Sequence, residues 1–134
     1  MSSFHLEILT PFGHYFNGDV EYIELRNPDG VLGIMAHHTP IITPVTLCKI
    51  VLKVKGNRKV YATTGGLFHM KKDGTASLML QTIERSDEID IDRAKQAKAR
   101  AQARIDAHKD TLNIQRAEDA IKRAENRIKV AQDK

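Results

Sequence analysis

The chain has 134 residues and a formal net charge of +4, which suits one ordinary domain or a small domain with an appendage. It contains no apolar run long enough to span a membrane, and its N-terminus lacks the basic and apolar regions of a secretory signal. Cys48 is the only cysteine, which excludes a disulfide framework and favours a reducing, cytosolic setting. Its apolar neighbours predict a buried thiol.

The positive charge is spread evenly along the chain. Residues 1–85 carry 9 basic and 7 acidic side chains and residues 86–134 carry 12 and 10, so each part has a net charge of +2. Nucleic-acid-binding proteins usually gather basic residues on one face and supply aromatic rings for base stacking. Here acidic residues are interleaved with basic ones, and residues 86–134 contain no aromatic residue. We therefore expect no nucleic-acid partner.

The composition changes abruptly at residue 86. All eight glycines, four prolines and seven Phe and Tyr residues lie between Phe4 and Gly74, whereas ten alanines lie between Ala94 and Ala131. Gly and Pro mark turns, whereas Ala, Arg and Lys are strong helix formers. The sequence therefore predicts two domains, a β domain over residues 1–85 and a helical domain over residues 86–134.

The first part contains several short segments that are typical of strands. Apolar and polar side chains alternate in Phe4–Ile8 and in Ile50–Val54, as in half-buried strands. Turn signals such as Asn27–Gly30 separate these segments. Their spacing predicts an antiparallel sandwich or barrel. The expected strands are Phe4–Ile8, Val20–Leu25, Val31–Met35, Ile50–Val54, Val60–Thr64 and Ala76–Ile83.

The second part is predicted to form two helices. Asp87 is the expected N-cap, and further acidic residues in the first turn suit the helix dipole. We expect the first helix to end near residues 109–111. The stripe residues then recur at spacings of three and four, as in an antiparallel helical hairpin. The two stripes are Ala94, Ala97, Ala101, Ile105, His108 and Leu112, then Ile114, Ala117, Ile121, Ala124, Ile128 and Ala131.

Alanine seams bury little area, so the hairpin should be marginally stable by itself. A partner could open it, and a ligand between its helices could lock it. Arginines lie beside the seams: Arg93 and Arg100 share a helix face, as do Arg116 and Arg123. Guanidinium forks match phosphate oxygens, so a phosphate site is one interpretation. The alternative is a solvated face with ion pairs such as Asp119 with Arg123.

Several motifs, in order along nearly the whole chain, resemble the epsilon subunit of the bacterial rotary (F-type) ATP synthase. In the first part these are Ile8–Pro11, Gly33–Met35 leading to His38–Pro40, and Thr64–Gly66. The most specific is Ile89–Ala94, which matches the Ile/Leu-Asp-x-x-Arg-Ala signature associated with ATP binding in that family. Gln115–Glu118, Ile121–Ala124 and Asn126–Arg127 match its second helix, whereas Phe12 and His69–Met70 depart from its pattern.

The resemblance implies a β-sandwich followed by an α-helical hairpin, with ATP as a regulatory ligand, with or without Mg²⁺. Ile89, Asp90 and Ala94 would frame and read the adenine, and Glu84 would help to hold the nucleoside end. The phosphates would lie among arginines of both helices. The implied ATP-binding residues are Glu84, Ile89, Asp90, Arg93, Ala94, Arg100, Arg123 and Arg127.

The resemblance also implies a non-catalytic role in the central stalk. The sandwich would bind the gamma subunit and the c-subunit ring, as a peripheral protein at the cytoplasmic face of the bacterial membrane. With ATP bound the hairpin would stay folded, and with ATP scarce it would extend toward the catalytic alpha and beta subunits and block hydrolysis. The alternative is a rotor-coupling and inhibitory subunit whose hairpin does not respond to ATP.

Nothing in the sequence indicates catalysis. There is no phosphate-binding loop with its Lys and Ser/Thr, and Gly65–Gly66 is more typical of a bend or bulge. No group of His, Cys or carboxylate residues has metal-binding spacing, and His38 is expected in a structural or interface role. We therefore expect no enzyme activity, no metal and no catalytic cofactor.

Overall fold

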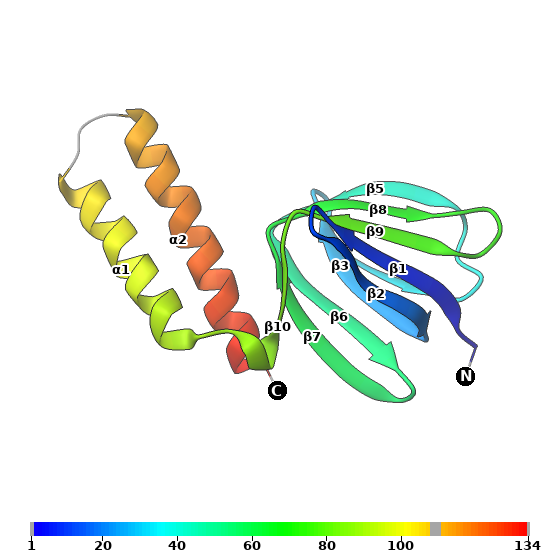
Figure 1. The fold of residues 1–134 in the computed structure, drawn as a ribbon. Helices are drawn as coiled ribbons and strands as arrows, with labels where there is room; N and C mark the ends of the chain where they lie inside the picture. The colour runs from blue at the N-terminus through cyan, green and yellow to red at the C-terminus, as the bar shows by residue number, and fades with distance from the viewer. Residues whose placement is uncertain (1, 108–110, 134) are drawn as a thin grey trace. The chain divides into compact units, whose positions relative to one another are not determined.

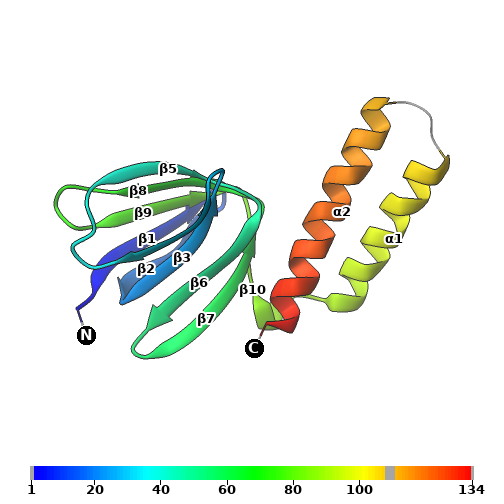
Figure 2. The same ribbon diagram turned by 180° about the vertical axis from the view of Figure 1, so that it is seen from behind.

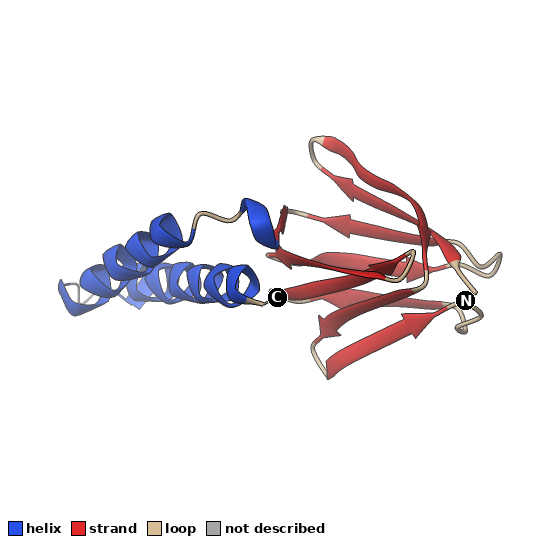
Figure 3. Ribbon diagram, turned by 90° about the horizontal axis from the view of Figure 1, so that it is seen from below, coloured by secondary structure: helices blue, strands red, loops and turns tan. Residues whose placement is uncertain are grey.

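The structure is a computed structural model that describes residues 2–107 and 111–133 (Figure 1). The chain divides into two compact units, Met1–Arg85 and Ser86–Lys134. The first unit is built from strands and the second from helices (Figure 3). The predicted fold class, a β-sandwich followed by a helical hairpin, is confirmed.

Two five-stranded sheets form the first unit, with strand orders β2-β1-β9-β8-β5 and β10-β7-β6-β3-β4 (Figures 1 and 2). Inward-facing side chains of the two sheets bury one another, which is how a sandwich makes its core. The strands are β1 (Phe4–Thr10), β2 (Gly13–Val20), β3 (Tyr22–Asn27), β4 (Gly30–Met35), β5 (Ile41–Val45), β6 (Cys48–Val54), β7 (Asn57–Thr63), β8 (Gly66–Met70), β9 (Ala76–Leu80) and β10 (Ile83–Arg85).

One pairing departs from the expected antiparallel pattern. Strand β1 pairs with β9 in parallel, with Leu6 opposite Ala76 and Ile8 opposite Leu78. The other pairings among the described strands are antiparallel. Strands joined by a tight turn must run antiparallel, but β1 and β9 are far apart in the chain and no such turn constrains them.

Two expected strands are wrong in their bounds because the chain passes from one sheet to the other. The segment Val20–Leu25 divides at Glu21, which separates β2 in one sheet from β3 in the other. The carboxylate of Glu21 accepts a hydrogen bond from the Gly56 amide at 2.6 Å. The segment Ala76–Ile83 divides in the same way, between β9 and β10. The alternation changes phase at both corners, because the inward-facing positions step by three residues, from Val20 to Ile23 and from Leu80 to Ile83.

Three strands were missed altogether. Strand β2 is largely exposed and lacks an apolar stripe. Strand β8 begins at Gly66, in the glycine pair that suggested a bend. Strand β5 contains Pro44, but it lies at the edge of its sheet, where a proline is tolerated because one side of the backbone has no partner. A Cβ atom on Gly66 would lie 1.8 Å from the Met79 carbonyl oxygen, so close strand packing requires this glycine.

The core of the sandwich consists of large apolar side chains from both sheets. Phe68, Leu6, Ile23 and Leu52 have no exposed surface, and burying each such side chain contributes about 1.5–3 kcal/mol. Cys48 is buried in the same cluster, as expected. Burial raises the pKa of its thiol, which keeps the thiol protonated and unreactive while the sandwich is folded.

The second unit begins with a 3₁₀ turn, η1 (Ser86–Glu88), followed by α1 (Ile91–Ala107) and α2 (Thr111–Gln132). The N-cap is Asp90 and not Asp87, because its carboxylate accepts a hydrogen bond from the Arg93 amide at 3.1 Å. Asp87 lies in η1, which continues the chain from β10 before the helix starts. The expected helix end near residues 109–111 lies partly outside the described residues.

Alanines form the interface of the two helices, as their spacing predicted. Ala94 and Ala101 of α1 and Ala117 and Ala124 of α2 are buried. Val130 is also buried, at 1 % exposure, although it lies outside the predicted stripe. His108 and Leu112, which the stripe included, have side chains outside the described set.

Candidate functional site

Each helix of the hairpin carries three arginines at matching spacings. In α1 the arginines are residues 93, 100 and 104, and in α2 they are residues 116, 123 and 127, so both helices repeat spacings of seven and four. Residues at these spacings share one face of a helix. Each helix therefore carries a row of three arginines beside its alanine seam.

An ion pair between the helices shows which residues of the two arginine rows lie level with each other. Lys98 Nζ lies 3.8 Å from Glu125 Oε1, which joins the two antiparallel helices on one side of the seam. Two residues correspond to about 200° around a helix. Arg100 and Arg123 are therefore level with each other and lie on the opposite side from this ion pair. We call the side that carries the arginines of both helices the arginine face.

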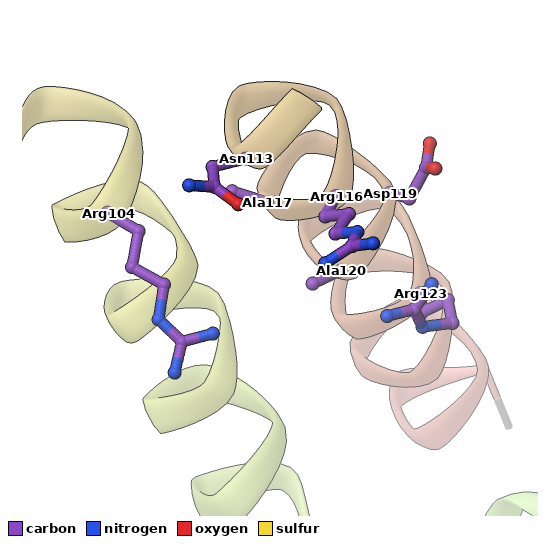
Figure 4. A pocket seen from close by; sticks show the side chains of 7 residues that line it. All are labelled: Arg104, Asn113, Arg116, Ala117, Asp119, Ala120 and Arg123. Atoms are coloured by element: carbon purple, nitrogen blue, oxygen red, sulfur yellow. The ribbon is translucent and has the colours of Figure 1, made fainter. Parts of the chain in front are cut away.

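A groove of about 510 Å³ lies on the arginine face. Figure 4 shows Arg104 projecting from α1 toward the side of α2 that carries Arg116 and Arg123. Ala117 and Ala120 lie beneath these longer side chains, and their small size leaves the groove open. The lining residues are Arg104, Asn113, Arg116, Ala117, Asp119, Ala120 and Arg123.

The three arginines of the groove are not neutralised by neighbouring carboxylates. Asp119 points away from α1 in Figure 4, and its Oδ1 accepts a hydrogen bond from Gln115 Nε2 at 3.1 Å. The expected Asp119–Arg123 ion pair is absent from the described residues. Three like charges on one groove repel one another, and an anion with several negative charges would relieve that repulsion.

The residues predicted to read the adenine lie at the start of α1. Asp90 is exposed and caps the helix, so one of its oxygens already accepts the Arg93 amide hydrogen. Ala94 is fully buried and Ile89 is 8 % exposed. Capping and seam packing thus explain Asp90 and Ala94 structurally.

The residues predicted to surround the phosphates come from both helices. Arg93, Arg100 and Arg123 are exposed, and Arg127 is half-buried. Antiparallel packing brings Arg100 level with Arg123, as derived from the Lys98–Glu125 ion pair. Glu84 belongs to the sandwich unit instead, on β10 opposite Ala62.

Arg123 is the one lining residue of the groove that belongs to the predicted site, and two arginines of the groove were not predicted. Arg104 follows Arg100 by four positions, and Arg116 precedes Arg123 by seven, so both continue the arginine rows. Arg116 shares a helix face with Arg123 and lies in the stretch Gln115–Glu118 that matches the family's second helix, but it was not among the implied ATP-binding residues. Extending the spacings of seven and four along both helices would have found both.

Other regions offer less chemistry. A second hollow of about 290 Å³ lies in the sandwich near Phe12 and Tyr15, and its lining contains no Lys, Arg, Asp or Glu side chain. Within the described residues, no three His, Cys, Asp or Glu side chains are placed to hold a metal ion. Neither described helix has the length and apolar character needed to cross a bilayer.

Comparison with known proteins identifies the family. Residues 3–86 match the family model for the β-sandwich domain of the ATP synthase delta/epsilon chain, and residues 87–132 match that for its long α-helix domain. The chain belongs to the ATP synthase delta/epsilon chain family. This confirms the resemblance to the epsilon subunit that the sequence motifs indicated.

Curated relatives and a solved structure agree with this family. The chain is 37 % identical to the ATP synthase epsilon chain of Bacillus pumilus over 118 residues, which cover 88 % of each chain. It is 40 % identical to that of Caldicellulosiruptor bescii over 106 residues, covering 79 % of this chain and 77 % of the relative. The fold also matches a chain of the Euglena gracilis mitochondrial ATP synthase structure, with a TM-score of 0.84 and 19 % identity, covering 94 % and 79 % of the two chains.

Proposed function

We propose that this chain is the non-catalytic epsilon subunit of a bacterial ATP synthase central stalk, whose hairpin acts as an ATP-sensitive brake on ATP hydrolysis. The sandwich binds the gamma subunit and the c-subunit ring, and the complex holds the chain at the cytoplasmic face of the membrane. The observation that carries the regulatory part is the arginine face, because its charges come from both helices.

A ligand that contacts both helices favours the closed hairpin over any extended form. ATP shifts this equilibrium only if it binds the closed form more tightly. At a free concentration of 100 times its Kd, a ligand specific for one state stabilises that state by about 2.7 kcal/mol. A seam of alanines, which buries little apolar area, gives an equilibrium that such an energy can shift.

The extended hairpin would carry the same arginines to the catalytic alpha and beta subunits. Each helix is about 25–33 Å long, from its 17 or 22 residues and a rise of about 1.5 Å per residue. Acidic segments of those subunits would then occupy the place that phosphates take in the closed form. ATP and inhibition therefore exclude each other in this mechanism.

The test is calorimetric titration of ATP into the purified chain. Arg123→Ala should weaken ATP binding at least tenfold, because it removes a charge from the phosphate cluster. Asp90→Asn should weaken binding while keeping the helix start intact, since Asn caps a helix as well as Asp does. Lys122→Ala is the matched control: it removes one positive charge from an exposed neighbour of Arg123 that lies off the arginine face.

Amide hydrogen exchange separates this proposal from the alternative in which the hairpin ignores ATP. If ATP holds the helices together, amides of α1 and α2 exchange more slowly when it is added, whereas those of the sandwich are unchanged. Unchanged exchange in the helices, or equal affinity in the wild type and Arg123→Ala, would favour a hairpin that only couples and inhibits.

A further inference from the structure

A second concentration of positive charge lies in the sandwich, at the turn that joins β6 to β7. Residues 53–59 contain four basic side chains, Lys53, Lys55, Arg58 and Lys59, and no acidic one. Lys55, Arg58 and Lys59 are exposed, and Lys53 is half-buried. Figure 1 shows this turn at the end of the β6–β7 hairpin. We call residues 53–59 the basic turn.

The backbone of the basic turn is held in one conformation. Lys55 and Gly56 alone join the paired strands, and both have positive φ angles, of 51° and 80°, which is the pattern of a type I′ turn. The carboxylate of Glu21 accepts a hydrogen bond from the Gly56 amide at 2.6 Å. The Glu21 amide donates another to the Lys53 carbonyl at 2.8 Å. The lysine side chains therefore project from a firmly bonded base.

Folding alone does not explain the residues of the basic turn. Asn, Asp or Gly usually occupies the position of Lys55, because a left-handed backbone is unfavourable for most residues with a Cβ atom. Lys53 lies directly opposite Arg58, and like charges so placed destabilise a strand pair. Within the described part of the chain, Lys53, Lys55 and Lys59 make no ion pair. Residues that conflict with local folding preferences are expected at functional sites.

We propose that the basic turn is a docking surface for an acidic segment of a partner protein. Lysine ammonium groups are point charges on flexible stems, so they adapt to carboxylates spaced along a chain. Lys59 lies opposite the core residue Leu52, and so on the other face of the hairpin from Lys53. An acidic segment that crosses the end of the hairpin contacts both faces. Such contacts increase the rate and specificity of association, and they weaken as salt is added.

An acidic protein segment fits the basic turn better than a lipid surface does. Stable attachment to a membrane needs an apolar or lipid anchor besides a basic patch, and the exposed large apolar side chains of the described residues lie outside residues 53–59. Strand β10 runs antiparallel to β7, with Arg85 opposite Tyr61, so the chain leaves its sheet toward the end that carries the basic turn. The helices that follow are those proposed to reach acidic segments, and this last step rests on the proposed function.

The experiment is a titration of the full chain with a short poly-L-glutamate peptide at low ionic strength, followed by amide chemical shifts. Saturable shifts should include residues 53–59. The variant K53Q/K55N should weaken the binding that these shifts report by about threefold or more, as expected for two exposed ion pairs. The control K71Q/K72Q removes the same charge from the exposed turn between β8 and β9 and should leave this binding unchanged. Circular dichroism checks that both variants remain folded.

The single substitution Lys55→Asn separates a binding role from a structural one. Asn adopts the left-handed conformation more readily than Lys does, so this variant should raise the unfolding temperature of the sandwich while it weakens peptide binding. A lysine that serves only the fold would not show this opposition. Peptide binding that stays unchanged in both Lys55→Asn and K53Q/K55N would overturn the proposal.

Other outcomes would also overturn it. Equal losses in the two double variants would mean that the peptide senses only net charge, and shifts confined to the arginine face would place its contact elsewhere. If K53Q/K55N loses binding to phosphatidylglycerol vesicles but keeps peptide binding, the basic turn contacts a lipid surface instead.

ATP titration of the same variants keeps this surface separate from the proposed nucleotide site. K53Q/K55N should keep the ATP affinity of the unsubstituted chain, whereas Arg123→Ala should weaken ATP binding and leave the peptide-induced shifts of residues 53–59 in place. Peptide binding at the basic turn without any ATP binding would overturn the ATP-sensitive brake and leave the docking surface standing.

Discussion

The sandwich and the hairpin bury very different side chains. Among the described residues, twelve large side chains are buried to below 2 % exposure, and Val130 is the one that belongs to the hairpin. The other eleven lie in the sandwich and include Phe68, Leu6 and Ile50. The hairpin seam relies on alanines such as Ala101 and Ala124. The hairpin therefore buries far fewer large apolar side chains than the sandwich does.

This difference assigns the two units different mechanical roles. Truncating one large buried side chain lowers the free energy of unfolding by several kilocalories per mole, because a cavity remains. Alanine contacts involve single methyl groups, each worth about 0.8 kcal/mol. The sandwich is thus the more strongly packed unit, and less apolar contact opposes separation of the two helices of the hairpin.

The largest expected effect is that of truncating the sandwich core. Phe68→Ala should lower the free energy of unfolding of the sandwich by about 3–5 kcal/mol, because Phe68 has no exposed surface. Denaturant unfolding measures this, and reaction of Cys48 with a thiol reagent reports the opening of the sandwich, since the buried thiol with its raised pKa reacts only after exposure.

Phe12→Ala is the matched control, because Phe12 is 99 % exposed. Its removal should change stability by less than about 0.5 kcal/mol. If both substitutions have similar effects, or if Phe68→Ala leaves Cys48 labelling unchanged, the sandwich is not the more strongly packed unit and the comparison fails.

An intermediate effect is expected from enlarging a seam residue. Ala101→Leu places a larger side chain where the helices meet at 3 % exposure, which should cost about 1–3 kcal/mol of hairpin closure. Ala103→Leu, an exposed position two residues later, should cost almost nothing. Amide exchange of α2 measures closure. Equal protection in the two variants would mean that the alanine seam does not hold the helices together.

Much of this contrast was predictable from residue types and spacing. The absence of Gly and Pro after residue 86 and the three-four spacing of the alanines predicted the hairpin, because both are local signals. The parallel pairing of β1 with β9 was not predictable, because it joins segments about 70 residues apart. The sheet change at Glu21 was missed although the alternation changes phase there, with the buried residues Val20 and Ile23 three positions apart.

The candidate site was partly predictable for similar reasons. The family signature pointed to Asp90, Arg93 and Ala94, and helical spacing pointed to the arginine rows. Spacing alone leaves open which side chains of one helix meet those of the other, since that depends on the register that the Lys98–Glu125 contact shows. Arg104, four residues after Arg100, was absent from the predicted set and enters the site through the groove that it lines.

The smallest expected effect concerns the side of the seam opposite the arginine face. Lys98 and Glu125 are 47 % and 44 % exposed, and exposed pairs contribute about 0.2–1 kcal/mol. A double-mutant cycle of Lys98→Gln and Glu125→Gln should therefore give a coupling energy of about 0.2–1 kcal/mol, measured by thermal unfolding of the helices, and this coupling should fall as salt is added. A coupling above about 1.5 kcal/mol would mean that the hairpin is closed mainly by its own ion pairs. In that case an anion on the arginine face would add little, and control of the hairpin by a ligand would lose its physical basis.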